Sequence, residues 1–187
     1  MLKLYLVRHA EYDNPENIYP FHLPLQLSKE GRDHAKRVGE WFQSNSLVLP
    51  IFTSPIVRAV QTSEIISSKI GSFVVVDRRL VETSHASLQG KTIQNKDDWK
   101  NQRKFPDREP QENQRDRILA VIYEKIDQNM PAILVSHGDP LSITLMSLVG
   151  KSIDPEQMST DDYIQKGEIV ELVFEEKELL SYKKTAV

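Results

Sequence analysis

The chain has 187 residues, no cysteine, a formal net charge of −3 and 39% hydrophobic residues. This length suits one domain, residues 1–187, with a substantial core, and the charge argues against a general nucleic-acid binder, which would carry a basic excess. The lack of cysteine excludes disulfides, thiolate nucleophiles and cysteine-ligated zinc. The apolar N-terminal run ends at Arg8, too soon for a signal peptide or a membrane span, so we expect a cytoplasmic protein without a membrane partner.

The first half of the chain alternates expected strands and helices. In chain order they are a strand at 4–7, a proline-rich ordered loop at 11–26, a helix at 28–43, a strand at 47–53, a helix from 54 and a short strand at 73–76. Ser28 is placed to cap the first helix. Ser54 is placed to cap the second, with Pro55 as its first residue, where the missing N–H costs nothing.

The second half continues this alternation after a polar, non-periodic excursion. The expected segments are that excursion at 91–110 with a helical turn around Asp97, a helix from about 112, a strand at 132–136, a helix from 139 to 150 and a strand at 168–175 that could pair with 179–183. Strands that alternate with helices predict an α/β fold, a three-layer sandwich whose mostly parallel sheet is covered by helices on both faces.

Two histidines that are far apart in the sequence, His9 and His137, each follow an apolar run typical of a buried strand. Because open α/β sheets bind ligands at the carboxyl ends of their strands, both side chains are expected at one cleft. Arg8 adds a fixed charge with planar donors for phosphate oxygens. Arg58 lies in the first turn of the second helix, near a positive dipole end and free backbone N–H groups. Together these groups indicate a pocket for a dianion.

Such a pocket suits phosphoryl transfer. Neutral imidazole is a competent nucleophile towards phosphorus, and a second histidine can stabilise the group in transfer. The leaving oxygen then needs an acid, for which Glu82, soon after the third strand, is the leading candidate. Taken singly, each residue has an ordinary explanation: Glu82 as a surface carboxylate, Asp139 as a helix cap, Gly138 as a tight turn. Their joint placement at strand-to-helix junctions favours the chemical interpretation.

Five short blocks follow one another between residues 4 and 150. They are Arg8-His9-Ala10-Glu11 with Asn14, Leu27-Ser28-Lys29-Glu30-Gly31, Ser54-Pro55-Ile56-Val57-Arg58-Ala59-Val60-Gln61-Thr62, Leu80-Val81-Glu82 with Gly90, and Ser136-His137-Gly138. The blocks and their order resemble the histidine phosphatase superfamily, the phosphoglycerate-mutase-like proteins, and specifically its short-chain phosphatase branch. The resemblance implies the phosphoglycerate-mutase-like sandwich.

The resemblance also implies a role for each residue of the blocks. His9 would be the nucleophile that becomes transiently phosphorylated, and Glu82 would be the proton donor. The phosphoryl group would be held by Arg8, Asn14, Arg58, His137 and Gly138. No metal and no cofactor are implied, because arginine, imidazolium and helix termini supply the electrostatic stabilisation.

The chain departs from the family pattern at a few positions. Ala10 stands in place of the usual glycine, and residues 111–113 replace a Gly-Glu-Ser run near where substrates are selected. Asp139 is a second acid candidate, since another branch of the family has an aspartate directly after its second histidine. Here the aspartate is one residue further on, so the earlier glutamate stays the leading candidate. His22 and His85 lie in loops and could line the cleft mouth. The spacing of these two histidines and His34 builds no metal site.

Phosphatases and mutases of this family share the machinery described above. The mutases are longer and carry a larger insertion after the Glu82 block, whereas this chain offers only residues 91–110 there. We therefore expect hydrolysis of a small phosphomonoester substrate. Two alternatives stay open: phosphoglycerate-type phosphoryl transfer, marked by little release of phosphate, and a non-catalytic module that binds phosphate without turnover. The sequence favours no particular ester and no oligomeric state.

Overall fold

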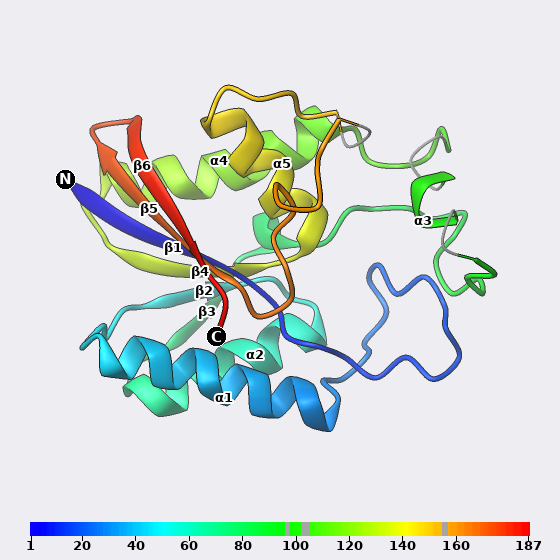
Figure 1. Cartoon of the computed structure of the whole chain (residues 1–187), viewed down its shortest axis with the longest axis horizontal. Helices are drawn as coiled ribbons and strands as arrows, with labels where there is room; N and C mark the ends of the chain where they lie inside the picture. Colours follow the sequence, from blue (N-terminus) through cyan, green and yellow to red (C-terminus); the bar gives the residue numbers. More distant parts are fainter. Residues whose placement is uncertain (96–97, 102–104, 155–156) are drawn as a thin grey trace.

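A computed structural model describes residues 1–95, 98–101, 105–154 and 157–187. Its centre is a six-stranded sheet in the order β3-β2-β4-β1-β5-β6, with helices on both faces (Figure 1). The strands are β1 (Leu2–Arg8), β2 (Ile51–Thr53), β3 (Val74–Val76), β4 (Ala132–Ser136), β5 (Ile169–Glu175) and β6 (Glu178–Thr185). The first four pair in parallel, and β5 and β6 are added antiparallel at one edge. The expected α/β sandwich with a mostly parallel sheet is confirmed.

The central strand β1 shows why the sheet needs cover on both sides. Its side chains alternate between the two faces: Leu4 and Leu6 join one apolar cluster, and Tyr5 and Val7 join the other. All four are at most 1% exposed. Near-continuous apolar runs of this kind are typical of strands that are buried on both faces.

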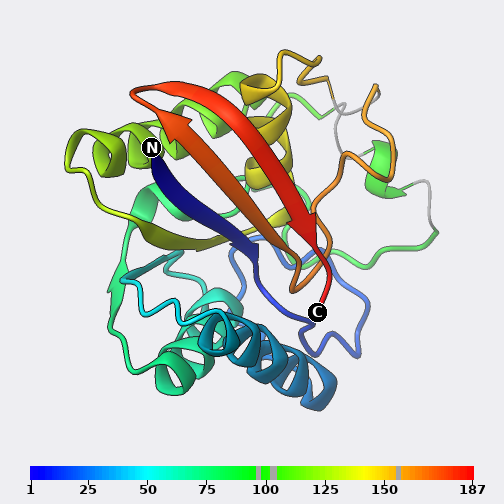
Figure 2. The ribbon, with the colours of Figure 1, turned by 60° about the vertical axis from the view of Figure 1, so that its left-hand side comes forward.

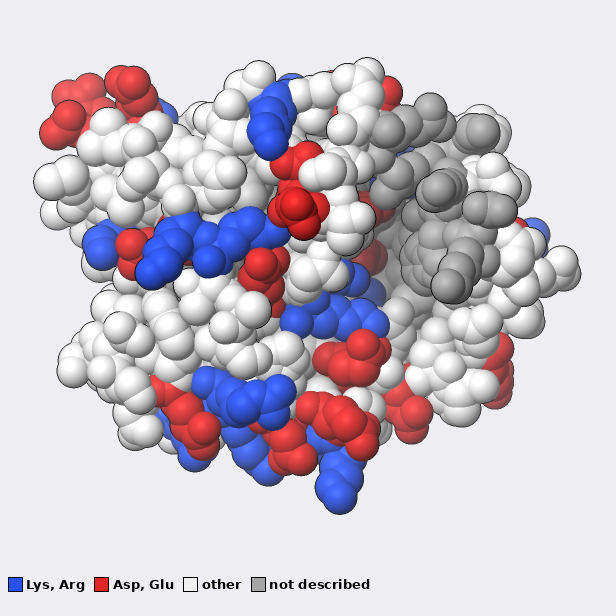
Figure 3. Space-filling model, in the orientation of Figure 1, with Lys and Arg blue, Asp and Glu red and all other residues white. Residues whose placement is uncertain are grey.

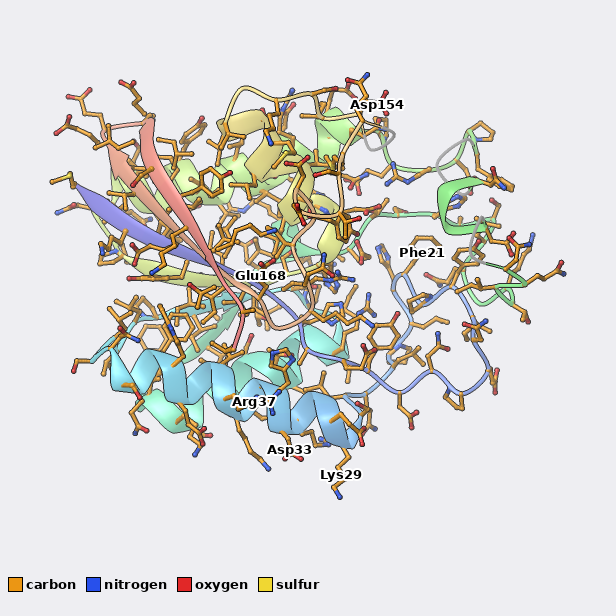
Figure 4. The ribbon with its side chains drawn as sticks, viewed as in Figure 1. Phe21, Lys29, Asp33, Arg37, Asp154 and Glu168 are labelled. Carbon is orange, nitrogen blue, oxygen red and sulfur yellow. The ribbon has the colours of Figure 1, made fainter. Side chains whose placement is uncertain are left out.

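Two pairs of helices supply that cover. They are α1 (Lys29–Ser44) with α2 (Val57–Ile70) on one face and α4 (Gln111–Asp127) with α5 (Gly138–Leu148) on the other (Figures 1 and 2). Phe42 of α1 packs into the cluster with Tyr5, and Ile118 of α4 packs into the opposite one. The outer side of α1 is solvated, because Lys29, Asp33 and Arg37 point away from the sheet (Figure 4).

The starts of α1 and α2 differ in how well the sequence predicted them. Ser28 caps α1 as expected, and its hydroxyl accepts a hydrogen bond from the N–H of Gly31 at 3.0 Å. The prediction that Ser54 caps the next helix is wrong, because α2 begins at Val57 and its N-cap is Ile56, which supplies no side-chain bond. The hydroxyl of Ser54 instead faces the end of β4, where a buried imidazole is its partner.

The ordinary explanation of Asp139 as a helix cap is also wrong. The helix begins at Gly138, and its N-cap is His137. Asp139 lies inside the first turn, where its carboxylate binds side chains from two distant segments. In both cases a polar side chain that could cap a helix has stronger partners at the edge of the sheet.

The excursion packs against the loop between β1 and α1. An isolated bridge pairs Ile18 with Thr92. Four buried side chains form a separate cluster, two from the loop, one from just before the excursion and one from the excursion itself: Tyr19, Phe21, Leu88 and Ile93. A short helix, α3 (Asp98–Asn101), lies close to where a helical turn was expected, although Asp97 itself lies outside the described residues. The loop and the excursion therefore form one side of the molecule beyond the C-terminal ends of the parallel strands.

Candidate active site

Three neighbouring strands end in one row of polar residues. β2 is followed by Ser54, β4 by His137 and β1 by His9. The ladder continues past the strands, since the N–H of His9 donates to the carbonyl of Ser136 at 2.9 Å and the N–H of Ser54 to that of Val135 at 3.0 Å. The two imidazole centroids lie 5.0 Å apart. The structure thus brings the two predicted histidines together at the edge where open α/β sheets bind ligands.

The hydrogen bonds of His9 define its tautomer. Its Nδ1 lies 2.7 Å from the carbonyl oxygen of Ala10, and because a carbonyl only accepts, Nδ1 carries the proton and Nε2 keeps its electron pair. Arg58 donates its Nε–H to that Nε2 at 3.1 Å. Burial, followed by the charges of Arg58 and Arg8, holds the pKa of His9 well below its ordinary value. His9 is therefore neutral, the form that can attack phosphorus.

The guanidinium of Arg58 connects the parts of the site. The residue is 1% exposed, and besides His9 its Nη2 donates to Nδ1 of His137 at 3.2 Å and to the carbonyl of Phe21 at 2.8 Å. Phe21 comes from the loop after β1 (Figure 4). The same Nη2 lies 3.7 Å from the carboxylate of Glu82. Burying a cation among mainly neutral hydrogen-bond acceptors costs free energy, because these acceptors do not balance its charge. A buried arginine of this kind is typical of a site that binds an anion.

His137 is fixed from both ring nitrogens. Its Nε2–H donates to Oγ of Ser54 at 2.8 Å, so Nδ1 is the acceptor that faces Arg58 and lies 3.6 Å from Glu82. Burial and the charge of Arg58 hold the pKa of His137 well below its ordinary value. A dianion beside the ring would favour the protonated form, and Nδ1 is the atom that would then donate to it.

Glu82 has the environment of a proton donor. Burial raises its pKa against the opposing charge of Arg58, and the charge of Asp139 adds to the rise. One carboxylate oxygen, Oε1, accepts from the N–H of Thr83 at 2.9 Å, and Oε2 faces Arg58 and His137. A raised pKa keeps the carboxyl protonated to higher pH, as a general acid at neutral pH requires.

Arg8 reaches the site beside the first residue of α5. Its Nη1 donates to the carbonyl of Ile164 at 2.9 Å, its Cζ lies 5.3 Å from the ring centre of Tyr163, and its buried Nε has no hydrogen-bond partner in the described part of the chain. A Cβ on Gly138 would lie 2.9 Å from that Cζ and 2.4 Å from the Tyr163 hydroxyl. The absence of a side chain at Gly138 therefore lets Arg8 and Tyr163 approach closely, since any Cβ there would make one of them move.

Asp139 holds two side chains from distant segments. Its Oδ1 accepts from the hydroxyl of Tyr163 at 2.6 Å, and its Oδ2 accepts from Nη2 of Arg108 at 2.6 Å. Two short hydrogen bonds, each accepted by one carboxylate oxygen, are typical of an ionised carboxylate. Asp139 is thus poorly suited to give up a proton, whereas Glu82, whose pKa it helps to raise, is better suited.

Asn14 is engaged with its own loop. Its Nδ2 donates to the carbonyl of Ile18 at 2.9 Å, and its Oδ1 accepts from the N–H of Ile18 at 3.1 Å. Among the hydrogen bonds between described residues, none joins Asn14 to His9 or His137. Its role in binding the phosphoryl group stays a prediction.

The loop histidines lie in two different settings. His22 donates from Nε2 to the carbonyl of Glu82 at 2.9 Å and lines a pocket of about 450 Å³ with Pro24, Pro55, Ile56, Val57, Arg78 and Val81. His85 is buried, with its ring centre 5.2 Å from that of Phe21. His22 therefore lies at an opening next to the site, whereas His85 belongs to the packing beneath the excursion.

Two supports of the site were not foreseen from the sequence. The ring centre of Tyr12 lies 5.5 Å from that of His9 and 5.2 Å from Cζ of Arg58. Thr62 accepts from the N–H of Ala10 at 3.1 Å and donates to the carbonyl of Arg58 at 2.7 Å, so it ties β1 to α2. Thr62 ends the third sequence block, which was a usable signal, but the spacing around Tyr12 gave none.

The described part of the chain offers no group of three or more histidine, aspartate or glutamate side chains that could hold a metal ion. Within the same residues, no helix is both long and apolar enough to cross a bilayer.

Comparisons with known proteins extend the likeness over most of the chain. The profile of the histidine phosphatase superfamily (branch 1) matches residues 4–182. The chain is 29% identical to Probable phosphoglycerate mutase GpmB of Salmonella choleraesuis over 164 residues, 80% of this chain and 76% of that protein. Its fold is similar to a mycobacterial glucosyl-3-phosphoglycerate phosphatase in complex with VO3 (TM-score 0.77, 22% identity, 92% and 93% of the two chains). It is also similar to the alpha-ribazole phosphatase of Shigella flexneri (TM-score 0.72, 22% identity, 95% and 93%). Because the profile spans nearly the whole chain, this protein belongs to the histidine phosphatase superfamily (branch 1), and the superfamily is the one that its motifs predicted.

Proposed function

We propose that this protein hydrolyses phosphate monoesters without a metal, through a covalent phosphohistidine on His9. The observation that carries the proposal is the state of the His9 ring: Ala10 holds the proton on Nδ1, and the electron pair of Nε2 points at the guanidinium of Arg58. Arg8 and His137 add further groups for the phosphoryl oxygens. Membership in a superfamily of phosphatases and phosphotransferases supports this class of reaction.

In the first step, Nε2 of His9 forms a bond to phosphorus while the P–O bond to the leaving alcohol breaks. Arg58 gives up its bond to Nε2 and donates to the phosphoryl oxygens, where the buried Nε of Arg8 is a further donor. The protonated carboxyl of Glu82 gives its proton to the leaving oxygen, so the alcohol departs neutral. The bond from Nδ1–H to the Ala10 carbonyl stabilises the charged ring of the intermediate.

In the second step, a water molecule attacks the phosphorus of the phosphohistidine. The carboxylate of Glu82 takes a proton from that water, the N–P bond breaks, and its electron pair returns to Nε2 of His9. Phosphate then leaves, and the site regains neutral His9 and protonated Glu82. Fixed cations serve both steps with little reorganisation, the usual source of large electrostatic contributions in enzymes.

Hydrolysis is favoured over phosphoryl transfer between hydroxyls because little of the chain is available to close the site against water. The segment that would do so, residues 91–110, is short. The proposed substrate is a small phosphorylated molecule. Basic and acidic side chains are interleaved on the face of Figure 3, and the net charge is −3, so this face offers no broad basic surface for a nucleic acid.

The proposal is tested by phosphate release from p-nitrophenyl phosphate in the presence of EDTA. We expect turnover by the native chain and none by His9→Ala. A control variant, His34→Gln on α1, removes a histidine that lies outside the site and should keep its turnover. Quenching with labelled ester should trap an acid-labile, alkali-stable phosphoryl group on the native protein only. Activity that persists in His9→Ala, or that EDTA abolishes, would contradict the mechanism.

The resemblance to a protein named a mutase provides a second candidate. For that reaction, phosphoglycerate would exchange its phosphoryl group between hydroxyls with little release of free phosphate. Nuclear magnetic resonance of the phosphorus nucleus separates the two reactions in one experiment. Binding of phosphate without either reaction would indicate a non-catalytic module and would exclude both.

A further inference from the structure

One buried arginine beside the site has no part in the proposed chemistry. Arg108 belongs to the excursion, and its side chain is only 3% exposed. Its Nη2 donates to Oδ2 of Asp139 at 2.6 Å, and its buried Nε has no hydrogen-bond partner among the residues that the structure describes. A buried cation is costly unless an opposite charge lies beside it. The pair with Asp139 therefore stabilises this arginine in its buried position.

The main chain fixes Arg108 next to the segment that carries the proposed acid. An isolated bridge pairs Arg108 with His85, and the N–H of Glu109 donates to the carbonyl of Ser84 at 2.9 Å. His85 and Ser84 follow Glu82 closely in the chain. The last part of the excursion is thus attached to the Glu82 segment, and the side chain of Arg108 extends from there to the first turn of α5.

Asp139 connects the excursion to a group that is proposed to bind phosphate. Its Oδ1 accepts from the hydroxyl of Tyr163 at 2.6 Å, and the ring centre of Tyr163 lies 5.3 Å from Cζ of Arg8. The next residue binds the same arginine, since the carbonyl of Ile164 accepts from Nη1 of Arg8 at 2.9 Å. Arg108, Asp139 and Tyr163 therefore form a chain of contacts that ends at Arg8.

The charge of Asp139 also acts on the proposed acid. Burial is the largest cause of the raised pKa of Glu82, the charge of Arg58 opposes it, and the charge of Asp139 adds to it. A carboxylate with a cation beside it exerts a weaker field on its neighbours, and Nη2 of Arg108 lies 2.6 Å from this one. Arg108 therefore limits how far Asp139 raises the pKa of Glu82.

Other charged or titratable side chains face Glu82 from the end of β1, the loop after it, α2, the end of β4 and the segment before β5: Arg8, Tyr12, Arg58, His137 and Tyr163. Arg108 differs from them in its position. No hydrogen bond or ion pair between described residues joins Arg108 to His9, His137 or Glu82, so its contacts lead to the site through Asp139.

We propose that Arg108 is a positioning residue of the active site, which acts through Asp139 in two ways: it holds Tyr163 against Arg8, and it offsets the negative charge that acts on Glu82. The inference rests on the proposed function, because Arg8 and Glu82 act in that reaction. It gives the excursion a part in the site, although Arg108 lies outside every sequence block that resembles the family.

The first test measures the alkaline limb of kcat/KM for an alkyl phosphate, glycerol 3-phosphate. The rate falls where Glu82 loses its proton, so a higher pKa moves the limb to higher pH. Arg108→Met removes the cation from Asp139 and should move the limb up by about one pH unit, the effect of one charge near a buried carboxyl. Asp139→Asn removes the negative charge but keeps an oxygen for the tyrosine hydroxyl, and it should move the limb down.

Two further variants separate charge from folding. The double variant Arg108→Met with Asp139→Asn lacks both charges, so its limb should lie between those of the single variants. Arg108→Lys keeps the cation and should stay close to the native profile. A merely structural role of Arg108 would lower the rate in its variants without moving the limb in opposite directions.

The second test measures affinity for inorganic phosphate. Tyr163→Phe keeps the ring beside Arg8 but loses the bond to Asp139, so phosphate should bind more weakly while the limb moves much less than in Arg108→Met. The matched control is Lys151→Met. Lys151 pairs at 2.6 Å with Asp162, which directly precedes Tyr163, and its side chain is 55% exposed. This variant loosens the same segment and should change neither the limb nor the affinity.

An unmoved limb in folded Arg108→Met, or a displacement in the same direction in Asp139→Asn, would overturn the inference. Equal losses of phosphate affinity in Tyr163→Phe and Lys151→Met would also overturn it. If Arg108→Met does not fold, the limbs of Asp139→Asn and the double variant decide the direction. Titration of Glu82 by nuclear magnetic resonance gives the same comparison even if no ester turns over, and p-nitrophenyl phosphate with His9→Ala tests the proposed function separately.

Discussion

The Nε of Arg58 lies 3.1 Å from the Nε2 of His9, so one guanidinium N–H occupies the electron pair that would attack phosphorus. The contact keeps the buried imidazole neutral and orients it. Phosphate oxygens are charged and accept stronger hydrogen bonds than a neutral imidazole. An arriving phosphate ester therefore draws the guanidinium to itself, and the same movement releases the nucleophile.

Replacing Arg58 by methionine tests this relationship. The pKa of His9 should rise, because the charge of Arg58 is the second cause of its lowering, after burial. The acid limb of the rate profile should then move to higher pH, since His9 must be neutral to attack. We expect kcat/KM to fall by about 10³, the upper range for loss of one preorganised donor. Titration of the His9 ring by nuclear magnetic resonance, with the pH dependence of kcat/KM, measures both effects.

Arg79→Met is the control for that variant. Arg79 also pairs with carboxylates, those of Asp77 and Glu124. It lies in the turn after β3, and no hydrogen bond between described residues joins its side chain to His9, His137 or Glu82. Its loss should leave kcat/KM and the pKa of His9 unchanged. An unshifted pKa in folded Arg58→Met would disprove the proposed control of His9 by this guanidinium.

Glu82→Gln tests the assignment of the proton donor. Turnover of alkyl phosphates, whose leaving groups need a proton, should fall by about 10² to 10⁴. Turnover of p-nitrophenyl phosphate should fall much less, because nitrophenolate leaves without one. In the native chain the rate should decrease as pH rises through the raised pKa of Glu82, where the acid form is lost. That alkaline limb should be absent from the variant, and its persistence would point to another acid.

The sequence predicted the sheet and both histidines because their signals are local. Apolar runs predict buried strands wherever both faces are covered, and each histidine directly follows such a run. The strand expected at 47–53 is shorter, however, and occupies only Ile51–Thr53. Strand ends depend on which neighbours are in register, and that information is not present in the segment itself.

The errors at Ser54 and Asp139 have a single physical cause. A serine or aspartate before an apolar helix is ordinarily a cap, and nothing nearby in sequence argues otherwise. Their actual partners, His137 for Ser54 and Tyr163 with Arg108 for Asp139, are 24 to 83 residues away. Only the assembled fold brings these groups together, so local rules give the wrong partner at the edge where function is concentrated.

Ser54→Ala tests the positioning of His137. The variant leaves the buried Nε2–H of His137 without its acceptor at 2.8 Å, which should cost about 1 to 3 kcal/mol of the free energy of unfolding. The ring also loses its orientation towards Arg58, so affinity for inorganic phosphate should fall along with kcat/KM. Urea unfolding and phosphate titration measure the two effects.

Ser63→Ala separates the loss of a buried hydroxyl from the loss of this orientation. Ser63 is equally buried on α2, and its hydroxyl donates to the carbonyl of Ala59 at 2.9 Å. This variant should show at most a small loss of stability and normal phosphate affinity. If the two serine variants behave alike, the bond to His137 has no special role.

Gly138→Ala tests the close approach of Arg8. The added Cβ would lie 2.4 Å from the Tyr163 hydroxyl and 2.9 Å from Cζ of Arg8, so one of the two side chains must move. Overpacking of this kind costs about 1 to 3 kcal/mol of stability. A shift of about 1 Å in a binding group lowers turnover by roughly 10².

The matched variant is Gly150→Ala at the other end of α5, where φ is +71° but a Cβ meets nothing within 4 Å. It should lose about 1 kcal/mol through backbone strain alone and keep full kcat/KM. Equal stability losses with activity lost only in Gly138→Ala would assign the effect to Arg8, whereas full activity in Gly138→Ala would show that Arg8 tolerates displacement.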